Sequence, residues 1–160
     1  MIKIGLIGAG HLGKIHIRLL KEIKEFDFIG FYDNDNDNID EIANEFDIKA
    51  FHSADKLIEQ CDAIDIVTPT EFHFKYAELA IKKDKHLFIE KPITKYLYEA
   101  NQLIKLSENK NIKIQVGHVE RFNAAYKAIK EHCNKPMFIE SHRLAEFNPR
   151  GTDVPVVHDL

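Results

Sequence analysis

Three glycines and one aspartate have the types and spacing needed to hold a dinucleotide. The stretch GAGHLG supplies Gly8, Gly10 and Gly13 directly after the apolar run IKIGLIG. In a strand-to-helix turn, the first glycine allows a tight bend and the second lets pyrophosphate approach the backbone, while the third lets helix and strand pack closely. Asp33 follows Gly13 by twenty residues. A carboxylate there accepts hydrogen bonds from a ribose diol and repels a 2′-phosphate, so the pattern predicts NAD as the cofactor in preference to NADP.

The same aspartate belongs to an acidic run, FYDNDNDNIDE, that resembles a calcium loop. An EF-hand loop needs acids at its first, third and fifth positions, which Asp33, Asp35 and Asp37 could supply. It also needs glycine at the sixth position and glutamate at the twelfth, where this chain has Asn38 and Asn44. We therefore expect no metal ion here. Asp33 is predicted to bind the ribose, and Asp35 and Asp37 to be solvated turn residues.

A second polar segment, VTPTEFH (residues 67–73), follows an apolar run that reads as a strand. It would lie at the carboxyl edge of a parallel sheet, where doubly wound proteins bind their ligands. Thr70 either caps the next helix or contacts the cofactor, and His73 either packs against that helix or takes part in the site. The further candidate cofactor contacts, in the glycine loop and in this segment, are His11, Leu12, Thr68, Pro69, Thr70 and His73.

The segment IEKPI (residues 89–93) ends another apolar run at the same expected edge. Glu90 and Lys91 are charged residues where an ordinary loop would need neither. Pro92 biases Lys91 towards an extended conformation and makes a cis peptide bond accessible. A lysine buried beside a cofactor can exchange a proton with a hydroxyl group. A solvated lysine is the alternative, and the spacing alone leaves both open.

The elements that must position these residues alternate between short apolar runs and segments of helical period, which is typical of an α/β fold with a doubly wound parallel sheet. The apolar positions Leu12, Ile15, Leu19, Leu20 and Ile23 mark the first helix. Strands are expected at residues 2–8, 27–33, 49–53, 63–69, 86–90 and 112–117, and helices at 12–23, 39–46, 54–60, 72–80 and 96–109. Six strands with crossover helices complete a Rossmann sheet by about residue 117, so residues 1–117 are expected to form the cofactor-binding domain.

The pattern changes after Gly117. Phe122, Tyr126, Ile129 and Cys133 line a helix, and MFIESHRLAEF (residues 137–147) alternates loosely like a strand. Residues 118–160 are therefore expected to begin a second α/β domain that the chain does not complete.

Composition excludes several other classes of protein. Of 160 residues, 44% are hydrophobic and 30% charged, and the formal net charge is −4, which gives no electrostatic footprint for nucleic acid or an anionic membrane. No apolar stretch approaches the roughly 20 residues of a membrane span. Cys61 and Cys133 fit no zinc spacing, and the N-terminus lacks the cleavage site of a signal peptide. We expect a reduced, cytoplasmic protein.

Four stretches, GAGHLGKIH, TPTEFH, EKPI and GHVERFNAA, together resemble the Gfo/Idh/MocA family of nicotinamide-dependent sugar dehydrogenases. The resemblance implies a Rossmann domain followed by a larger α/β domain that carries the substrate and often a homo-oligomer contact. It also implies that Lys91 assists proton transfer at the reacting hydroxyl, while Glu90 and Pro92 line the nicotinamide ribose. Arg121 and Phe122 match the segment where the second domain meets the cleft. Arg121 is either a substrate or cofactor contact or an exposed arginine.

One signature of the family is incomplete in this chain. Asp159, in VVHDL, looks like a catalytic aspartate that the family follows four residues later with a histidine, which would fall beyond Leu160. His158 is not in that place. The resemblance therefore implies a truncated enzyme that binds NAD. The GHVERFNAA stretch looks most like members that act on nucleotide-activated amino sugars such as UDP-N-acetylglucosamine. The alternative is a dinucleotide-binding module without catalysis, such as a redox sensor or an assembly subunit.

Overall fold

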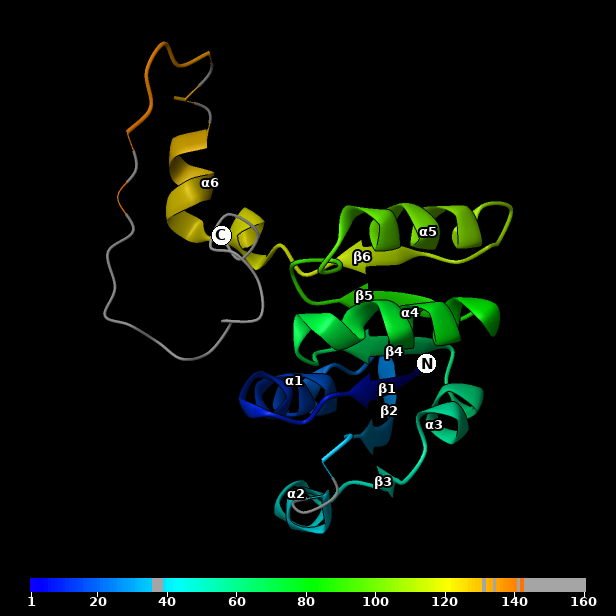
Figure 1. The fold of residues 1–160 in the computed structure, drawn as a ribbon. Helices are drawn as coiled ribbons and strands as arrows, with labels where there is room; N and C mark the ends of the chain where they lie inside the picture. The colour runs from blue at the N-terminus through cyan, green and yellow to red at the C-terminus, as the bar shows by residue number, and fades with distance from the viewer. Residues whose placement is uncertain (36–38, 131, 134, 141, 143–160) are drawn as a thin grey trace.

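The computed structural model describes residues 1–35, 39–130, 132–133, 135–140 and 142. Strands and helices alternate along the first two thirds of the chain, as the apolar periods predict (Figure 1). The strands are β1 (Ile2–Ile7), β2 (Phe26–Tyr32), β3 (Ala50–Phe51), β4 (Ala63–Ile66), β5 (His86–Ile89) and β6 (Ile114–Val116). The helices are α1 (His11–Glu22), α2 (Ile39–Phe46), α3 (Ala54–Gln60), α4 (His73–Lys82), α5 (Leu97–Ser107) and α6 (Ala124–Lys130), with 3-10 turns η1 (Thr70–Phe72) and η2 (Val119–Phe122).

The six strands form one parallel sheet in the order β3-β2-β1-β4-β5-β6. This order reverses direction between β1 and β4, which leaves a crevice at the carboxyl ends of those two strands. The sheet confirms the predicted doubly wound Rossmann fold. The third strand is only two residues long.

Helices cover both faces of the sheet, because neighbouring residues of a strand point to opposite sides. Leu6 of β1 belongs to a core cluster with Ile17 and Leu20 of α1. The next residue, Ile7, belongs to the other cluster, with Tyr76 of α4. Thus α1 and α4 lie on opposite faces, and the end of β1 runs between them.

The side of helix α1 that packs against the sheet is not the one that carries most of its apolar residues. A Cβ built on Gly13 would collide with the carbonyl of Gly8, so only glycine permits this contact. The side of α1 that carries Gly13 therefore faces the sheet, and Ile17 and Leu20, four and seven residues later, are buried with it. The rest of the apolar stripe that marks this helix in the sequence is 39–52% exposed: Leu12, Ile15, Leu19 and Ile23.

Beyond β6 the described chain packs little against the sheet. Figure 1 shows α6 set apart from the sheet, and Phe122, Tyr126 and Ile129, which were predicted to line a helix, are exposed. The described residues of the predicted strand at 137–147, namely 137–140 and 142, form no strand. The division into domains at residue 117 remains a prediction.

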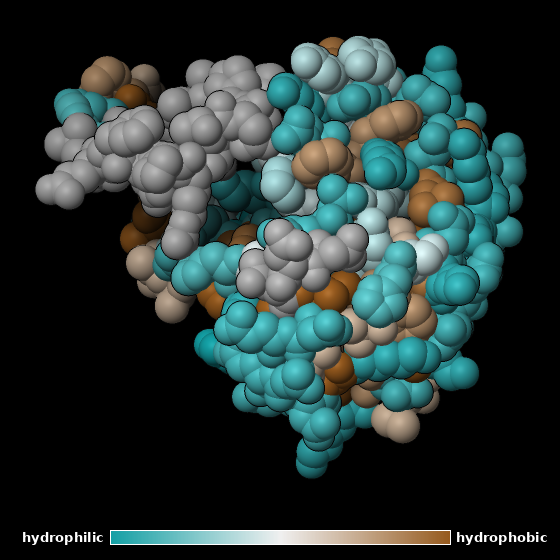
Figure 2. Space-filling model, turned by 60° about the horizontal axis from the view of Figure 1, so that its bottom comes forward, coloured by the Kyte–Doolittle hydropathy of each residue, from teal (hydrophilic) through white to brown (hydrophobic). Residues whose placement is uncertain are grey.

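Most of the face seen in Figure 2 is hydrophilic, with apolar patches between polar side chains. Among the described residues, no helix is both long and apolar enough to cross a membrane. Both cysteines are free thiols, with Cys61 buried and Cys133 exposed. Within the described part of the chain, no group of three or more His, Cys, Asp or Glu side chains is arranged to hold a metal ion.

Candidate functional site

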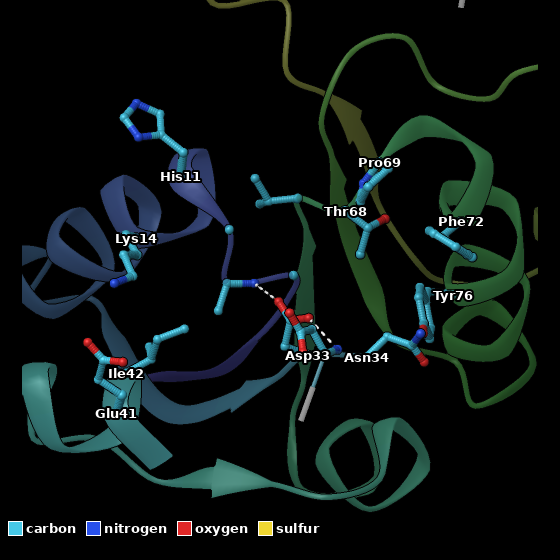
Figure 3. A pocket seen from close by; sticks show the side chains of 15 residues that line it. His11, Lys14, Asp33, Asn34, Glu41, Ile42, Thr68, Pro69, Phe72 and Tyr76 are labelled. Carbon is cyan, nitrogen blue, oxygen red and sulfur yellow. Dashed lines mark hydrogen bonds between the residues drawn. The ribbon is translucent and has the colours of Figure 1, made fainter. Parts of the chain in front are cut away.

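A cleft of about 670 Å³ opens at the carboxyl edge of the sheet, where the strand order reverses. Three loops form it: the glycine loop after β1, the acidic loop after β2 and the segment after β4 (Figure 3). Its lining consists of Gly8, Ala9, Gly10, His11, Lys14, Asp33, Asn34, Asp35, Glu41, Ile42, Val67, Thr68, Pro69, Phe72 and Tyr76.

The glycine loop has the backbone geometry that a dinucleotide needs. Gly8 adopts a φ of 98°, and a Cβ there would lie 2.7 Å from the carbonyl group of Val67. Gly10 is different, because a Cβ there would have no neighbour within 4 Å. Gly10 immediately precedes α1 and has no side chain to cap it, so the first N–H groups of α1 stay available to an anion.

Asp33 connects the acidic loop to the glycine loop. Its Oδ2 accepts a hydrogen bond from the backbone N–H of Ala9 at 2.6 Å, and its Oδ1 accepts one from the N–H of Asp35 at 2.9 Å. Figure 3 shows Asp33 in the middle of the cleft, with His11 and Lys14 on one side and Phe72 and Tyr76 on the other. Lys14 pairs with Glu45 of α2 at 2.7 Å. Asp37 lies outside the described residues.

Two buried hydroxyl groups in the cleft lining, those of Thr68 and Tyr76, make no hydrogen bond of good geometry among the described residues, although Tyr32 lies close enough to act on the Tyr76 hydroxyl. Burial raises the pKa of Tyr76, so its hydroxyl remains a neutral donor. Leaving a buried polar group unpaired is unfavourable. Together with the open space at Gly10, these two hydroxyls fit a polar, phosphate-bearing ligand such as a dinucleotide.

The segment after β4 distributes its predicted site residues differently. Thr68 and Pro69 line the cleft, whereas Thr70 is buried and begins the η1 turn. The residue that precedes α4 is Phe72, so Thr70 does not cap that helix. His73 is only 1% exposed, and its ring nitrogens lie 2.9 Å from the carbonyl oxygens of Thr68 and Pro92.

The acidic residue of the segment after β5, Glu90, points into the protein. Glu90 is buried, and its Oε1 lies 3.5 Å from Nε2 of His16 in α1. The other nitrogen of His16, Nδ1, lies 2.8 Å from Oδ2 of Asp65 in β4. Lys91 is half-buried, and its peptide bond to Pro92 is cis. Glu90, Lys91 and Pro92 are not among the residues that line the cleft.

The remaining predicted residues are away from the cleft. Leu12 is exposed on α1, and Gly13 serves the contact between α1 and the loop. Arg121 lies exposed in η2, where it lines a second hollow of about 660 Å³ beside β6 together with Phe122. Asp159 lies outside the described residues.

Sequence reasoning missed several residues. Asn34 and Glu41 line the cleft, but exposed polar residues carry no signal of their own. Phe72, the last residue of η1, also lines it, whereas the sequence placed it at the start of the expected helix at 72–80. Tyr76 lies in the middle of that expected helix and was not predicted to line the cleft. The signal for Asp65 was present, since an acid in the middle of the apolar strand AIDI requires a buried partner. That partner, His16, is three residues beyond the last motif glycine.

Comparison with known proteins agrees with this architecture. The family Gfo/Idh/MocA, described as an oxidoreductase family with an NAD-binding Rossmann fold, matches residues 2–118. UDP-N-acetylglucosamine 3-dehydrogenase from Acidithiobacillus ferrooxidans is 36% identical over 160 residues, which cover 99% of this chain and 50% of that protein. Glucose-6-phosphate 3-dehydrogenase from Bacillus subtilis is 30% identical over 130 residues, covering 81% and 37%.

Solved structures give the same result. One of the Acidithiobacillus enzyme superposes with a TM-score of 0.89 at 35% identity, covering 99% of this chain and 52% of that one. Scyllo-inositol dehydrogenase from Lactobacillus casei, solved with NAD(H) and scyllo-inositol, superposes with a TM-score of 0.75 at 29% identity, covering 82% and 40%. The chain spans about half the length of the Acidithiobacillus enzyme. The family model matches residues 2–118, most of this chain, and the doubly wound sheet carries the glycine loop. This chain therefore belongs to the Gfo/Idh/MocA family of oxidoreductases.

Proposed function

We propose that this chain binds NAD in the cleft between the glycine loop and the segment after β4. The observation that carries the proposal is the Asp33 carboxylate, held 2.6 Å from the N–H of Ala9 inside that cleft. An acid at the end of the second strand accepts hydrogen bonds from a ribose diol. Asp35 and Glu41 add negative charge to the same lining, which opposes the 2′-phosphate of NADP.

Each side of the cleft has a part in this binding. The first turn of α1 offers N–H groups and the positive end of the helix dipole to the pyrophosphate, at the point where Gly10 leaves room. The buried hydroxyls of Thr68 and Tyr76 would take polar atoms of the nucleoside as partners if the lining adjusts when NAD binds. Phe72 and Ile42 supply apolar surface for its base.

We further propose that the complete protein is a dehydrogenase of sugars, cyclitols or nucleotide sugars, working as a homo-oligomer. Bound NAD would supply the carbon that takes up or returns a hydride. Lys91 Nζ takes the proton from the substrate hydroxyl as that hydride leaves the carbinol carbon, and returns it in the reverse direction. The substrate class is supported by the names of the relatives, above all UDP-N-acetylglucosamine 3-dehydrogenase, which aligns with 99% of this chain.

Titration calorimetry with NAD and with NADP tests the binding proposal. Tighter binding of NAD is expected, and tighter binding of NADP would contradict the role of Asp33. Lys91→Met tests the chemistry, with UDP-N-acetylglucosamine as the probe substrate. Turnover should be lost while the Kd for NAD is kept. NAD binding without turnover by the native protein on any sugar substrate would favour the non-catalytic dinucleotide-binding module.

A further inference from the structure

Lys91 lies between two residues that histidines contact, the half-buried His16 and the buried His73. Before it, the Glu90 carboxylate is in ion-pair contact with His16 of α1. After it, the Pro92 carbonyl oxygen lies 2.9 Å from Nδ1 of His73 in α4. Because α1 and α4 cover opposite faces of the sheet, the Lys91 segment is fixed from both sides.

His16 is itself anchored from the far side of its ring. Its Nδ1 lies 2.8 Å from Oδ2 of Asp65, whose side chain is only 4% exposed. Burial lowers the pKa of His16, but the carboxylates of Asp65 and Glu90 outweigh that effect and raise the pKa to about 9. The two carboxylates therefore favour the imidazolium form of His16, which compensates negative charge that would be costly to bury alone, while burial raises the pKa of Asp65 itself. The ring of Phe88, 6.1 Å away, adds an uncharged wall.

Glu90 links His16 to the backbone of Lys91. Its second oxygen, Oε2, accepts a hydrogen bond from the backbone N–H of Lys91 at 3.1 Å. Burial acts to raise the pKa of Glu90, yet the hydrogen bonds from His16 and from the Lys91 N–H hold it below the ordinary value. A Cβ on the facing Gly117 would lie 2.7 Å from Glu90 Oε1, so the carboxylate has little room to move.

We propose that His16 is a positioning residue for Lys91. By bridging Asp65 and Glu90, it keeps Glu90 anionic and fixed against the Lys91 backbone, so that the lysine side chain leaves the sheet edge in one direction. This inference rests on the proposed role of Lys91 in proton transfer, and its test separates the two.

The first measurement needs no substrate. Reductive methylation with formaldehyde, mapped by mass spectrometry, gives the rate at Lys91 relative to the exposed lysines Lys24 and Lys56 of the same sample. His16→Gln should raise the rate at Lys91 several-fold, because Glu90 loses its anchor and no longer holds the half-buried Lys91 in one position. Exposed His52→Gln serves as the matched control and should leave the ratio unchanged. A general loss of stability would change the methylation rates of all lysines together and leave this ratio unchanged.

Glu90→Gln keeps the His16–Asp65 pair and removes the Glu90 charge that links His16 to the Lys91 backbone, so it remains informative if His16→Gln does not fold. Glu90→Gln alone should raise the Lys91 rate relative to Lys24 and Lys56, since it weakens the contact that holds the Lys91 backbone. In the double variant, His16→Gln should then have no further effect, since coupled residues give non-additive changes. An unchanged ratio in both single variants, or strictly additive effects, would overturn the inference.

Turnover with NAD and UDP-N-acetylglucosamine provides the second measurement. His16→Gln should lower kcat by up to about 10²-fold, the cost of misplacing a reacting group by roughly 1 Å, while the Kd for NAD stays close to native. If Lys91→Met is inactive and His16→Gln is fully active, the positioning role of His16 is refuted while the proton-transfer role of Lys91 stands. If Lys91→Met is active, the proposed chemistry fails. Should the native protein not use this substrate, the methylation result decides.

Discussion

The Asp33 carboxylate and the Ala9 backbone N–H are joined by a hydrogen bond of 2.6 Å, which ties the end of β2 to the glycine loop. One side chain thus has two functions, fixing the loop and presenting its charge to the cleft. Residues 24 positions apart in the chain meet there only because β1 and β2 pair in parallel register.

Asp33→Asn tests the cofactor preference. The amide keeps the size of the side chain but loses its charge, so NAD binding should weaken by about 1–3 kcal/mol, the usual cost of losing a charged hydrogen-bond partner. The preference for NAD over NADP should shrink as well. Calorimetric titration with both cofactors measures this, and Asp40→Asn, at an exposed acid of α2, is the control. An unchanged preference would show that Asp33 does not select the cofactor.

Alanine at two glycines of the GAGHLG motif should have different effects, one on stability and the other on NAD binding. Gly13→Ala forces a methyl group against the Gly8 carbonyl and should destabilise the fold by about 1–3 kcal/mol, as overpacking does. Gly10→Ala places its methyl in open space, so stability should stay within about 1 kcal/mol of native while NAD binding is lost. Chemical denaturation and calorimetry separate the effects. Equal loss of stability in both variants would contradict this division.

Tyr76→Phe removes a buried hydroxyl that makes no hydrogen bond of good geometry among the described residues. Its deletion should leave the unfolding free energy unchanged or raise it, because no hydrogen bond is lost within the described protein. If the hydroxyl binds the nucleoside, the Kd for NAD should rise by about three- to tenfold, equivalent to one hydrogen bond of roughly 0.5–1.5 kcal/mol. The exposed Tyr98→Phe is the matched control. Stability lost without any change in affinity would refute the assignment.

Stability should fall as pH rises through the titration of His16. The pKa of His16 is raised from 6.5 to about 9, so its contribution is complete below pH 6.5 and is lost as pH rises through about 9. A shift of this size corresponds to something on the order of 3 kcal/mol of unfolding free energy. NMR titration of the ring and denaturation at several pH values measure the two quantities.

Glu90→Gln sharpens this measurement. Removing one of the two carboxylates should lower the pKa of His16, so the loss of stability should begin at a lower pH than in the native chain. His52→Gln should leave the pH dependence unchanged, because that histidine is exposed between β3 and α3. A native His16 that titrates near 6.5 would show that the buried cluster does not hold its charge.

Local patterns were sufficient to predict the elements of the sheet domain up to β6, but the strand predicted at 137–147 is absent from the described residues there. The helices at 39–46 and 54–60 have the predicted bounds, and the sheet has the predicted six parallel strands. Apolar period and turn glycines are properties of neighbouring residues, so they survive without tertiary information. The role of Gly13 as a close-packing residue also followed from the motif alone.

Which side of an element is buried was not decided locally. Leu12, Ile15 and Leu19 of α1, and Ile23 directly after it, are exposed because the approach of Gly13 to the Gly8 carbonyl determines the orientation of the helix. Period identifies a helix, but contact geometry selects the face that packs against the sheet.

The sequence by itself determined a doubly wound sheet, a dinucleotide loop and an acid at the end of the second strand. Only the tertiary structure brought together His16, Asp65 and Glu90, from α1, β4 and the end of β5. His16 and Asp65 are 49 positions apart in the chain, and Asp65 and Glu90 are 25 apart. No local pattern links side chains at such separations; they meet because the strand order places β4 between β1 and β5 beneath the same helix.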